Sequence, residues 1–245
     1  MIEWLLGPID PSRAHEVGLN VAWHARLMVL AWGVLIPLGV IIARFGKVMP
    51  GQDWPRQLDN PTWWHSHLSL QYIAGAAMLG GLGMILMRPG EGLGATLHVF
   101  AGWTILSLAG VQFLAGWLRG TKGGPTSPAA DGSYAGDHYD MTLRRKIFEH
   151  VHKTLGYLLL AAATATILSG LWITNAPVWM WLALIAWWIL YVVGFVALQR
   201  RRLAVDTYQA IWGPSKTHPG NRIPPIGWGV RRVDERTVER QGEPS

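Results

Sequence analysis

The stretch VGLNVAWHARLMVLAWGVLIPLGVIIA, residues 17–43, is apolar over nearly its whole length and holds one charged residue, Arg26. About 20 such residues are enough to cross a bilayer as a helix. Four more apolar runs of similar length follow, at 64–87, 95–118, 147–173 and 178–198. None shows the alternation of period two that a membrane β-barrel requires. The sequence therefore predicts an all-α integral membrane bundle of five transmembrane helices.

Composition and charge support the same class. Of the 245 residues, 50% are hydrophobic, 15% are charged and 15 are tryptophan, which is too apolar and aromatic for an ordinary soluble domain. The net charge of +6 comes from basic residues beside the apolar runs, so we expect the lipid bilayer as partner and no nucleic acid. The absence of cysteine excludes thiolate-held clusters and covalent haem attached through CxxCH.

Two segments lie outside the spans. Residues 120–146 are rich in Gly, Pro, Ser and Asp, which argues against a helix for most of this loop. Residues 200–245 are also rich in Pro and Gly, yet they carry Trp212 and Trp228, so the tail either packs on the cytoplasmic face or stays unpacked. We predict a transmembrane domain at 1–199, a cytoplasmic tail at 200–245 and no cleaved signal peptide.

The distribution of Lys and Arg predicts the topology. With five spans, residues 44–63, residues 119–146 and the tail share one side of the membrane, and this side carries most of the basic residues. The other side has little beyond Arg13 and Arg88. The positive-inside rule then places the N-terminus outside and the C-terminus in the cytoplasm, as in a bacterial inner membrane.

Four of the nine histidines share one property. His24, His67, His98 and His152 each lie one to two turns inside the N-terminal end of a predicted span. Because successive spans run in opposite directions, His24 and His98 fall in the outer half of the bilayer. His67 and His152 fall in the inner half. The sequence thus predicts two layers with two histidines each.

A histidine inside a membrane is costly and normally faces the bundle interior with a partner. Two imidazoles at one depth can hold a flat macrocycle between facing helices, and a haem iron closed on both sides suits electron transfer. Single membrane histidines also serve as proton relays or hydrogen-bonding residues, and a metal transporter is another interpretation. Transporter sites usually add carboxylates, which the span interiors lack apart from Glu149 at a boundary.

Helical geometry chooses between neighbouring histidines. Residues two apart on a helix point about 200° apart, so His150 and His152 cannot face the same site. The face of His152 continues through Gly156, whereas that of His150 continues through Lys153. We therefore predict His152 as the ligand and His150 as an interfacial residue.

The same reasoning favours His67 over His65. In two spans the predicted ligand is followed four residues later by glycine, Gly102 after His98 and Gly156 after His152. A glycine there lets a planar ring approach the backbone. Close helix packing is the alternative interpretation of both glycines.

Cations and amides near the predicted ligands are further candidates. Arg26 and Arg88 on the outer side, and Arg119, Lys122 and Lys153 on the inner side, are candidates to complement haem propionates. Anchoring by the positive-inside rule is the alternative for the inner group. Gln71 and Gln112 are placed either to hydrogen-bond within the bundle or to lie near a haem. We expect the remaining histidines outside the spans, His15, His138 and His218, at the surface.

Four segments carry a family resemblance: HARLMVLAWGVLIPLGVIIARF from 24, WWHSHLSLQY from 63, HVFAGWTILSLAGVQFLAGWLRG from 98 and HVHKTLGY from 150. Together they resemble the cytochrome b561 transmembrane family, in the form often attached to DOMON domains, over roughly residues 20–198. The resemblance implies two b haems per chain, held by the pairs His24/His98 and His67/His152. Family members commonly have six helices, and this sequence shows five and no DOMON domain, so a stand-alone form is expected.

What the resemblance implies for function is transmembrane electron transfer, with one haem near each membrane face. An alternative is the haem-bearing membrane anchor of a dehydrogenase that exchanges electrons with quinone. A haem-free transporter or scaffold is a third hypothesis. The donor and acceptor are a quinone, a small reductant or a redox protein, and ascorbate is not assigned. A second copy of the chain or a dehydrogenase is a candidate protein partner.

Overall fold

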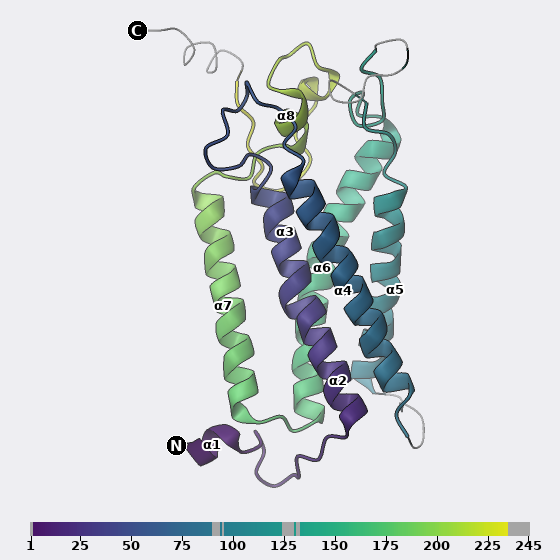
Figure 1. The fold of residues 1–245 in the computed structure, drawn as a ribbon, viewed down its shortest axis with the longest axis vertical. Helices are drawn as coiled ribbons and strands as arrows, with labels where there is room; N and C mark the ends of the chain where they lie inside the picture. The colour runs from purple at the N-terminus through teal and green to yellow at the C-terminus, as the bar shows by residue number, and fades with distance from the viewer. Residues whose placement is uncertain (1, 90–93, 95, 124–129, 131–132, 235–245) are drawn as a thin grey trace. The chain divides into compact units, whose positions relative to one another are not determined.

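The computed structural model describes residues 2–89, 94, 96–123, 130 and 133–234. A short helix, α1 (Ile2–Leu6), precedes five helices that are long and apolar enough to cross a membrane. Figure 1 shows these as α2 (Leu19–Met28) continuing through η1 (Val29–Leu35) into α3 (Ile36–Phe45), then α4 (Thr62–Leu86), α5 (Leu97–Trp117), α6 (Leu143–Ile173) and α7 (Val178–Arg200). The short helices α8 (Thr207–Trp212) and η2 (Pro219–Arg222) follow. The predicted all-α class, with five spans, is confirmed.

The start of α6 is the clearest shift from the predicted boundaries. The helix begins at Leu143 rather than at residue 147. Thr142 caps it, since its hydroxyl oxygen accepts a hydrogen bond from the backbone N–H of Arg145 at 3.3 Å. The added first turn is polar, so hydropathy alone does not mark it as part of the span.

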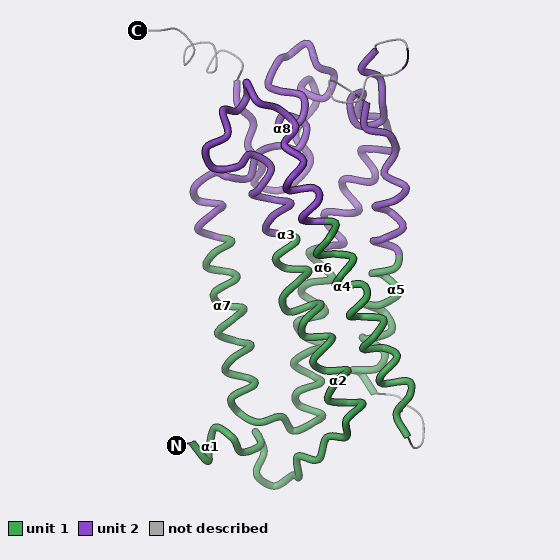
Figure 2. The backbone as a smooth tube through the Cα atoms, viewed as in Figure 1, with its two compact units in different colours: residues 1–40, 68–110, 157–195 green, residues 41–67, 111–156, 196–245 purple. Residues whose placement is uncertain are grey.

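The chain divides into two compact units (Figure 2). Unit 1 comprises residues 1–40, 68–110 and 157–195, and unit 2 comprises residues 41–67, 111–156 and 196–245. All five long helices run through both units, so each unit is assembled from parts of the same helices. His24 and His98 belong to unit 1, and His67 and His152 belong to unit 2.

In unit 1, the first span contains a π-helical stretch before Pro37. Proline has no N–H, so the carbonyl of Gly33, four residues earlier, lacks its usual helical donor. The indole Nε1 of Trp187 on α7 donates to this carbonyl at 2.7 Å. A polar backbone group inside a membrane needs such a partner, so this bond joins α7 to the first span.

Also in unit 1, the N-terminal segment is fastened to the turn between α6 and α7. The amide Nδ2 of the buried Asn175 donates to the carbonyls of Asp10 at 3.0 Å and Arg13 at 2.7 Å, and its Oδ1 accepts from the Asp10 N–H at 3.0 Å. The backbone of Pro8 bridges to that of Pro177. The α6–α7 turn is short, as the sequence predicts.

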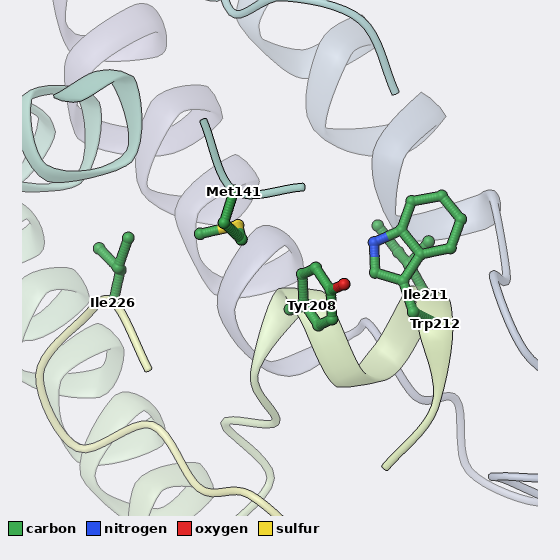
Figure 3. Packing of buried hydrophobic residues seen from close by; sticks show 5 residues of the cluster. All are labelled: Met141, Tyr208, Ile211, Trp212 and Ile226. Carbon is green, nitrogen blue, oxygen red and sulfur yellow. The ribbon is translucent and has the colours of Figure 1, made fainter. Parts of the chain in front are cut away.

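In unit 2, the C-terminal segment packs instead of remaining loose. Every residue of α8 is buried, and Tyr208, Ile211 and Trp212 from this helix form a cluster with Met141 and Ile226 (Figure 3). Asp206 caps α8 by accepting from the Tyr208 N–H. Of the two interpretations of the tail, packing holds for this part of it. Trp228 is 77% exposed and takes no part in the cluster.

Candidate functional site

In unit 1, two predicted ligands face each other. His24 on α2 and His98 on α5 have ring centroids 6.4 Å apart, with the ring planes at 77°. Two rings whose nitrogens each lie roughly 2 Å from one metal, on opposite sides of it, have centres roughly 6 Å apart. The pair therefore has the spacing that one metal between two imidazoles requires.

Hydrogen bonds at Nδ1 determine which nitrogen of each ring is available. His24 Nδ1 lies 2.9 Å from the Gly81 carbonyl oxygen, and His98 Nδ1 lies 3.1 Å from the Thr166 carbonyl oxygen and 3.0 Å from Ser169 Oγ. A carbonyl can only accept, so both Nδ1 atoms carry the hydrogen and donate. The lone pair is then on Nε2, which is the arrangement typical of metal-bound histidine.

Glycines make room around His98. A Cβ atom on Gly170 of α6 would lie 3.0 Å from His98 Cε1, so this glycine is where the imidazole fits against the helix. Gly102, one turn after His98, has no atom within 4 Å of its Cβ position among the described residues. Two imidazole donors, the 6.4 Å between their ring centroids and the open space beside Gly102 fit a haem. Gly170 was missed by the sequence reasoning, because it is far from His98 along the chain.

Gly170→Ala is expected to weaken haem retention in unit 1. The added methyl group would press on His98 Cε1 and tilt the ring away from Thr166 and Ser169. Gly194→Ala on α7, where a Cβ meets nothing within 4 Å in the described structure, is the matched control. The haem-to-protein absorbance ratio of each purified variant measures the effect. Equal ratios in the two variants would contradict the role of Gly170.

The two outer cations predicted from the sequence are both exposed. The guanidinium of Arg26 lies 5.3 Å from the centroid of the Trp23 ring, on the first turns of the span. Arg88 follows the end of α4. Neither side chain is buried, and their assignment to a haem propionate stays a prediction.

In unit 2, His67 on α4 and His152 on α6 are each partly buried, while His65 and His150 are exposed. Trp64, which lies beside His67, and Phe148, which lies beside His152, line one cleft of unit 2. His150 Nδ1 donates to the Lys146 carbonyl of its own helix at 2.8 Å. The structure therefore turns His67 and His152 inward and leaves their sequence neighbours at the surface.

Aromatic rings flank this second pair. The Trp64 and His67 ring centroids are 6.3 Å apart, and those of Phe148 and His152 are 5.0 Å apart. His152 Nδ1 is buried and has no hydrogen-bond partner within the described part of the chain. The donor type fits a haem here too, but His152 lacks the Nδ1 acceptor that both ligands of unit 1 have.

Gln112 occupies the open side of Gly156. Its Nε2 donates to the His152 carbonyl at 2.6 Å and lies 3.1 Å from where a Cβ on Gly156 would be. Gly156 therefore accommodates an amide in this structure, whereas Gly102 borders open space. Gln71 Nε2 is buried without a hydrogen-bond partner among the residues described.

A buried carboxylate organises the charges near His152. Glu149 is 4% exposed, and it accepts hydrogen bonds from Arg145 Nε at 2.9 Å and Lys153 Nζ at 2.6 Å. Lys153 Nζ also donates to the Ile226 carbonyl at 2.7 Å. Lys153, a predicted propionate partner, thus joins α6 to the C-terminal segment.

A cleft of about 130 Å³ opens beside these groups within unit 2. The other two inner cations lie on it: the Arg119 guanidinium is 3.9 Å from the Trp64 ring centroid, and Lys122 pairs with Asp59. Trp64, Phe148, His138 and Arg145 also line the cleft. The cleft therefore brings Arg119 and Lys122 next to Trp64 and Phe148, the two rings that flank His67 and His152.

His138 corrects one expectation, because it is buried rather than at the surface. It is 2% exposed, and its ring packs edge-on to Tyr208 and near Trp212 of α8. Burial, followed by the charge of Arg145, lowers the pKa of His138 to about 3, so the ring is neutral at pH 7. The C-terminal segment, through Tyr208 and Trp212, and Glu149 of α6 together cover it.

Lys47 is another buried titratable residue of unit 2. Its Nζ donates to the Val205 carbonyl at 3.1 Å, which fastens the C-terminal segment to the residue just beyond α3. Burial, reinforced by repulsion from Lys153, lowers the pKa of Lys47 to about 7.

No group of three or more His, Cys, Asp or Glu that could hold a metal ion occurs among the residues described.

No family model and no solved structure matches the chain, but curated proteins do. A cytochrome b561 and DOMON domain-containing protein of Arabidopsis thaliana is 31% identical over 152 residues, which is 60% of this chain and 27% of the relative. A second such Arabidopsis protein is 27% identical over 199 residues, covering 76% of this chain and 43% of the relative. A third, which also has a DM13 domain, is 28% identical over 148 residues, or 60% of this chain and 14% of the relative.

The chain thus spans less than half the length of each of these relatives. All three are plant proteins, so they lend no support to a bacterial inner membrane. The similarity to several cytochrome b561 proteins agrees with the five membrane-spanning helices and with the resemblance carried by the histidine-containing segments. These findings show that the chain is similar to cytochrome b561 proteins over 60–76% of its length.

Proposed function

We propose that this protein carries single electrons across the membrane through two b haems, one near each membrane face. His24 and His98 hold one haem, and His67 and His152 hold the other. The observation that carries the proposal is the His24–His98 pair, with rings 6.4 Å apart and both Nδ1 atoms donating to acceptors of the chain. Similarity to cytochrome b561 proteins supports it.

A haem held by two histidines would supply an iron that gains and loses one electron without binding substrate. The chain contributes orientation. The Gly81 carbonyl holds His24, and the Thr166 carbonyl and Ser169 hydroxyl hold His98, so that Nε2 of each ring carries the lone pair that would bind iron. Gly102 borders the space for the ring, and Arg26, Arg88 and Lys153 are the cations that we assign to the propionates.

The candidate electron donors and acceptors fall into three chemical classes: quinones, small reductants and redox proteins. The cleft lined by Arg119 and Lys122, next to Trp64 and Phe148, is the place where we propose that a polar molecule approaches the unit 2 pair. None of the three Arabidopsis relatives is named as a dehydrogenase subunit, and no contact within the described residues favours the anchor function.

Purified protein is expected to contain two non-covalent b haems per chain. The ratio of haem, measured as its pyridine derivative, to protein, measured by amino-acid analysis, should be close to two. Acid-acetone should extract all of it, because the chain has no cysteine to form a thioether bond. Colourless protein, a ratio near one, or haem that stays with the chain would each contradict the proposal.

The proposed topology places the N-terminus outside and residue 245 in the cytoplasm, with the His67/His152 haem on the cytoplasmic side. A reporter enzyme fused after Ser245 should then behave as cytoplasmic. In intact cells, Lys122 and the exposed Lys216 should resist a membrane-impermeant amine reagent, and both should react after permeabilisation. An external reporter would reverse the sides and leave the pairing of histidines unchanged.

A further inference from the structure

His152 differs from both ligands of unit 1 in that its buried Nδ1 has no hydrogen-bond partner among the described residues, and charged side chains lie near it on its own helix. From this difference we infer that the haem held by His24 and His98 has the lower midpoint potential of the two, and that Ser169 is a positioning residue that helps to set it. The inference rests on the proposed function, since it needs a haem in each unit. It assigns a role to Ser169 that the ligand set alone does not indicate.

In unit 1, Ser169 is oriented to accept from His98. Its hydroxyl donates to the Thr166 carbonyl at 2.8 Å, so the hydrogen of Ser169 is already used and a lone pair of Oγ is left for His98 Nδ1 at 3.0 Å. The Thr166 carbonyl accepts from the same Nδ1 at 3.1 Å. One imidazole N–H is thus shared between two acceptors.

Acceptors at Nδ1 pull its hydrogen away from the ring and make the imidazole a more basic ligand. A more basic ligand stabilises the oxidised iron, which carries one more positive charge than the reduced iron. His24 has the same kind of acceptor, the Gly81 carbonyl at 2.9 Å. Both ligands of unit 1 therefore act to lower the potential of the haem that they hold.

In unit 2, the corresponding features act in the opposite direction. His152 Nδ1 has no acceptor within the described structure, so the ring is a weaker donor to iron. Arg145 and Lys153 carry positive charge on the same helix as His152, and Glu149, which pairs with both, carries the opposing negative charge. Positive charges near a haem disfavour its oxidised state and raise its potential.

The further test is a potentiometric titration of the holoprotein, followed by optical spectra, on wild type and on Ser169→Ala. The variant loses one of the two acceptors of His98, so the lower of the two midpoint potentials should move upward while the higher one stays. Thr166→Val is the matched control, because the Thr166 hydroxyl bonds to the Ala162 carbonyl of its own helix and the Thr166 carbonyl remains. Both potentials should be unchanged in this control.

A second variant assigns the potentials directly. His98→Ala should lose the unit 1 haem, and the haem that remains should titrate at the higher wild-type potential. A remaining haem at the lower potential, or a shift of the higher potential in Ser169→Ala, or no shift in that variant, overturns the inference. Wild-type protein with fewer than two haems would instead refute the proposed function, so the two failures are distinguishable.

Discussion

Replacing His152 by alanine is expected to leave one haem per chain, whereas His150→Ala keeps two. His152 is partly buried, and in the proposed pair its loss would leave the unit 2 haem with His67 as its single protein ligand. His150 is exposed and bonds only to the carbonyl of Lys146 on its own helix in the described structure. The two variants remove the same side chain from positions two apart, so they are matched in chemistry and differ in helix face.

Haem content per chain and the reduced-minus-oxidised spectrum measure both variants. The spectrum of His152→Ala should lose one component and keep that of the unit 1 haem. If His150→Ala loses a haem and His152→Ala does not, the assigned face of α6 is wrong. If both variants keep two haems, neither histidine is a ligand and the proposed pair in unit 2 fails.

Trp212→Ala is expected to lower the free energy of unfolding by about 3–5 kcal/mol, as for other buried large aromatic side chains. Trp212 is 2% exposed and packs in the cluster with Met141, Ile211 and Ile226. Its removal leaves a cavity beneath α8. Denaturant unfolding of the purified protein in detergent, followed by the near-ultraviolet signal of the C-terminal cluster, measures the change.

Trp228→Ala is the control for this prediction. Trp228 lies in the same C-terminal segment but is 77% exposed, so its loss should change the free energy of unfolding by only about 0.5 kcal/mol. Equal effects of the two substitutions would show that α8 does not pack within unit 2 as described. Limited proteolysis of the segment in Trp212→Ala gives an independent measure, because a loosened α8 becomes a substrate.

The five spans could be predicted because their signal is local. Each is a run of apolar residues longer than the bilayer core, and the observed helices start and end within four residues of the predicted runs. The faces of α4 and α6 were also predictable, since a helical period of 3.6 residues forces His65 and His67, or His150 and His152, to opposite sides. The exposure of His65 and His150 agrees with that prediction.

The start of α6 marks the limit of this local signal. Its first turn, from Leu143 to Lys146, is mostly charged, and it belongs to the helix because of the Thr142 cap rather than because of hydropathy. The loop before it likewise gave no sign that His138 would be buried. That burial depends on Tyr208 and Trp212, some 70 residues further along the chain.

By itself, the sequence determined the class and the number of spans, and it predicted that His65 and His150 are more exposed than His67 and His152, because these properties follow from composition and helical period along one segment. Only the tertiary structure decided what surrounds the histidines. Ser169 and Gly170 reach His98 from another helix, and Lys153 meets Ile226 across 73 positions. Such contacts depend on which helix faces pack together, and the pattern within a single helix carries no information about the residues of its neighbour.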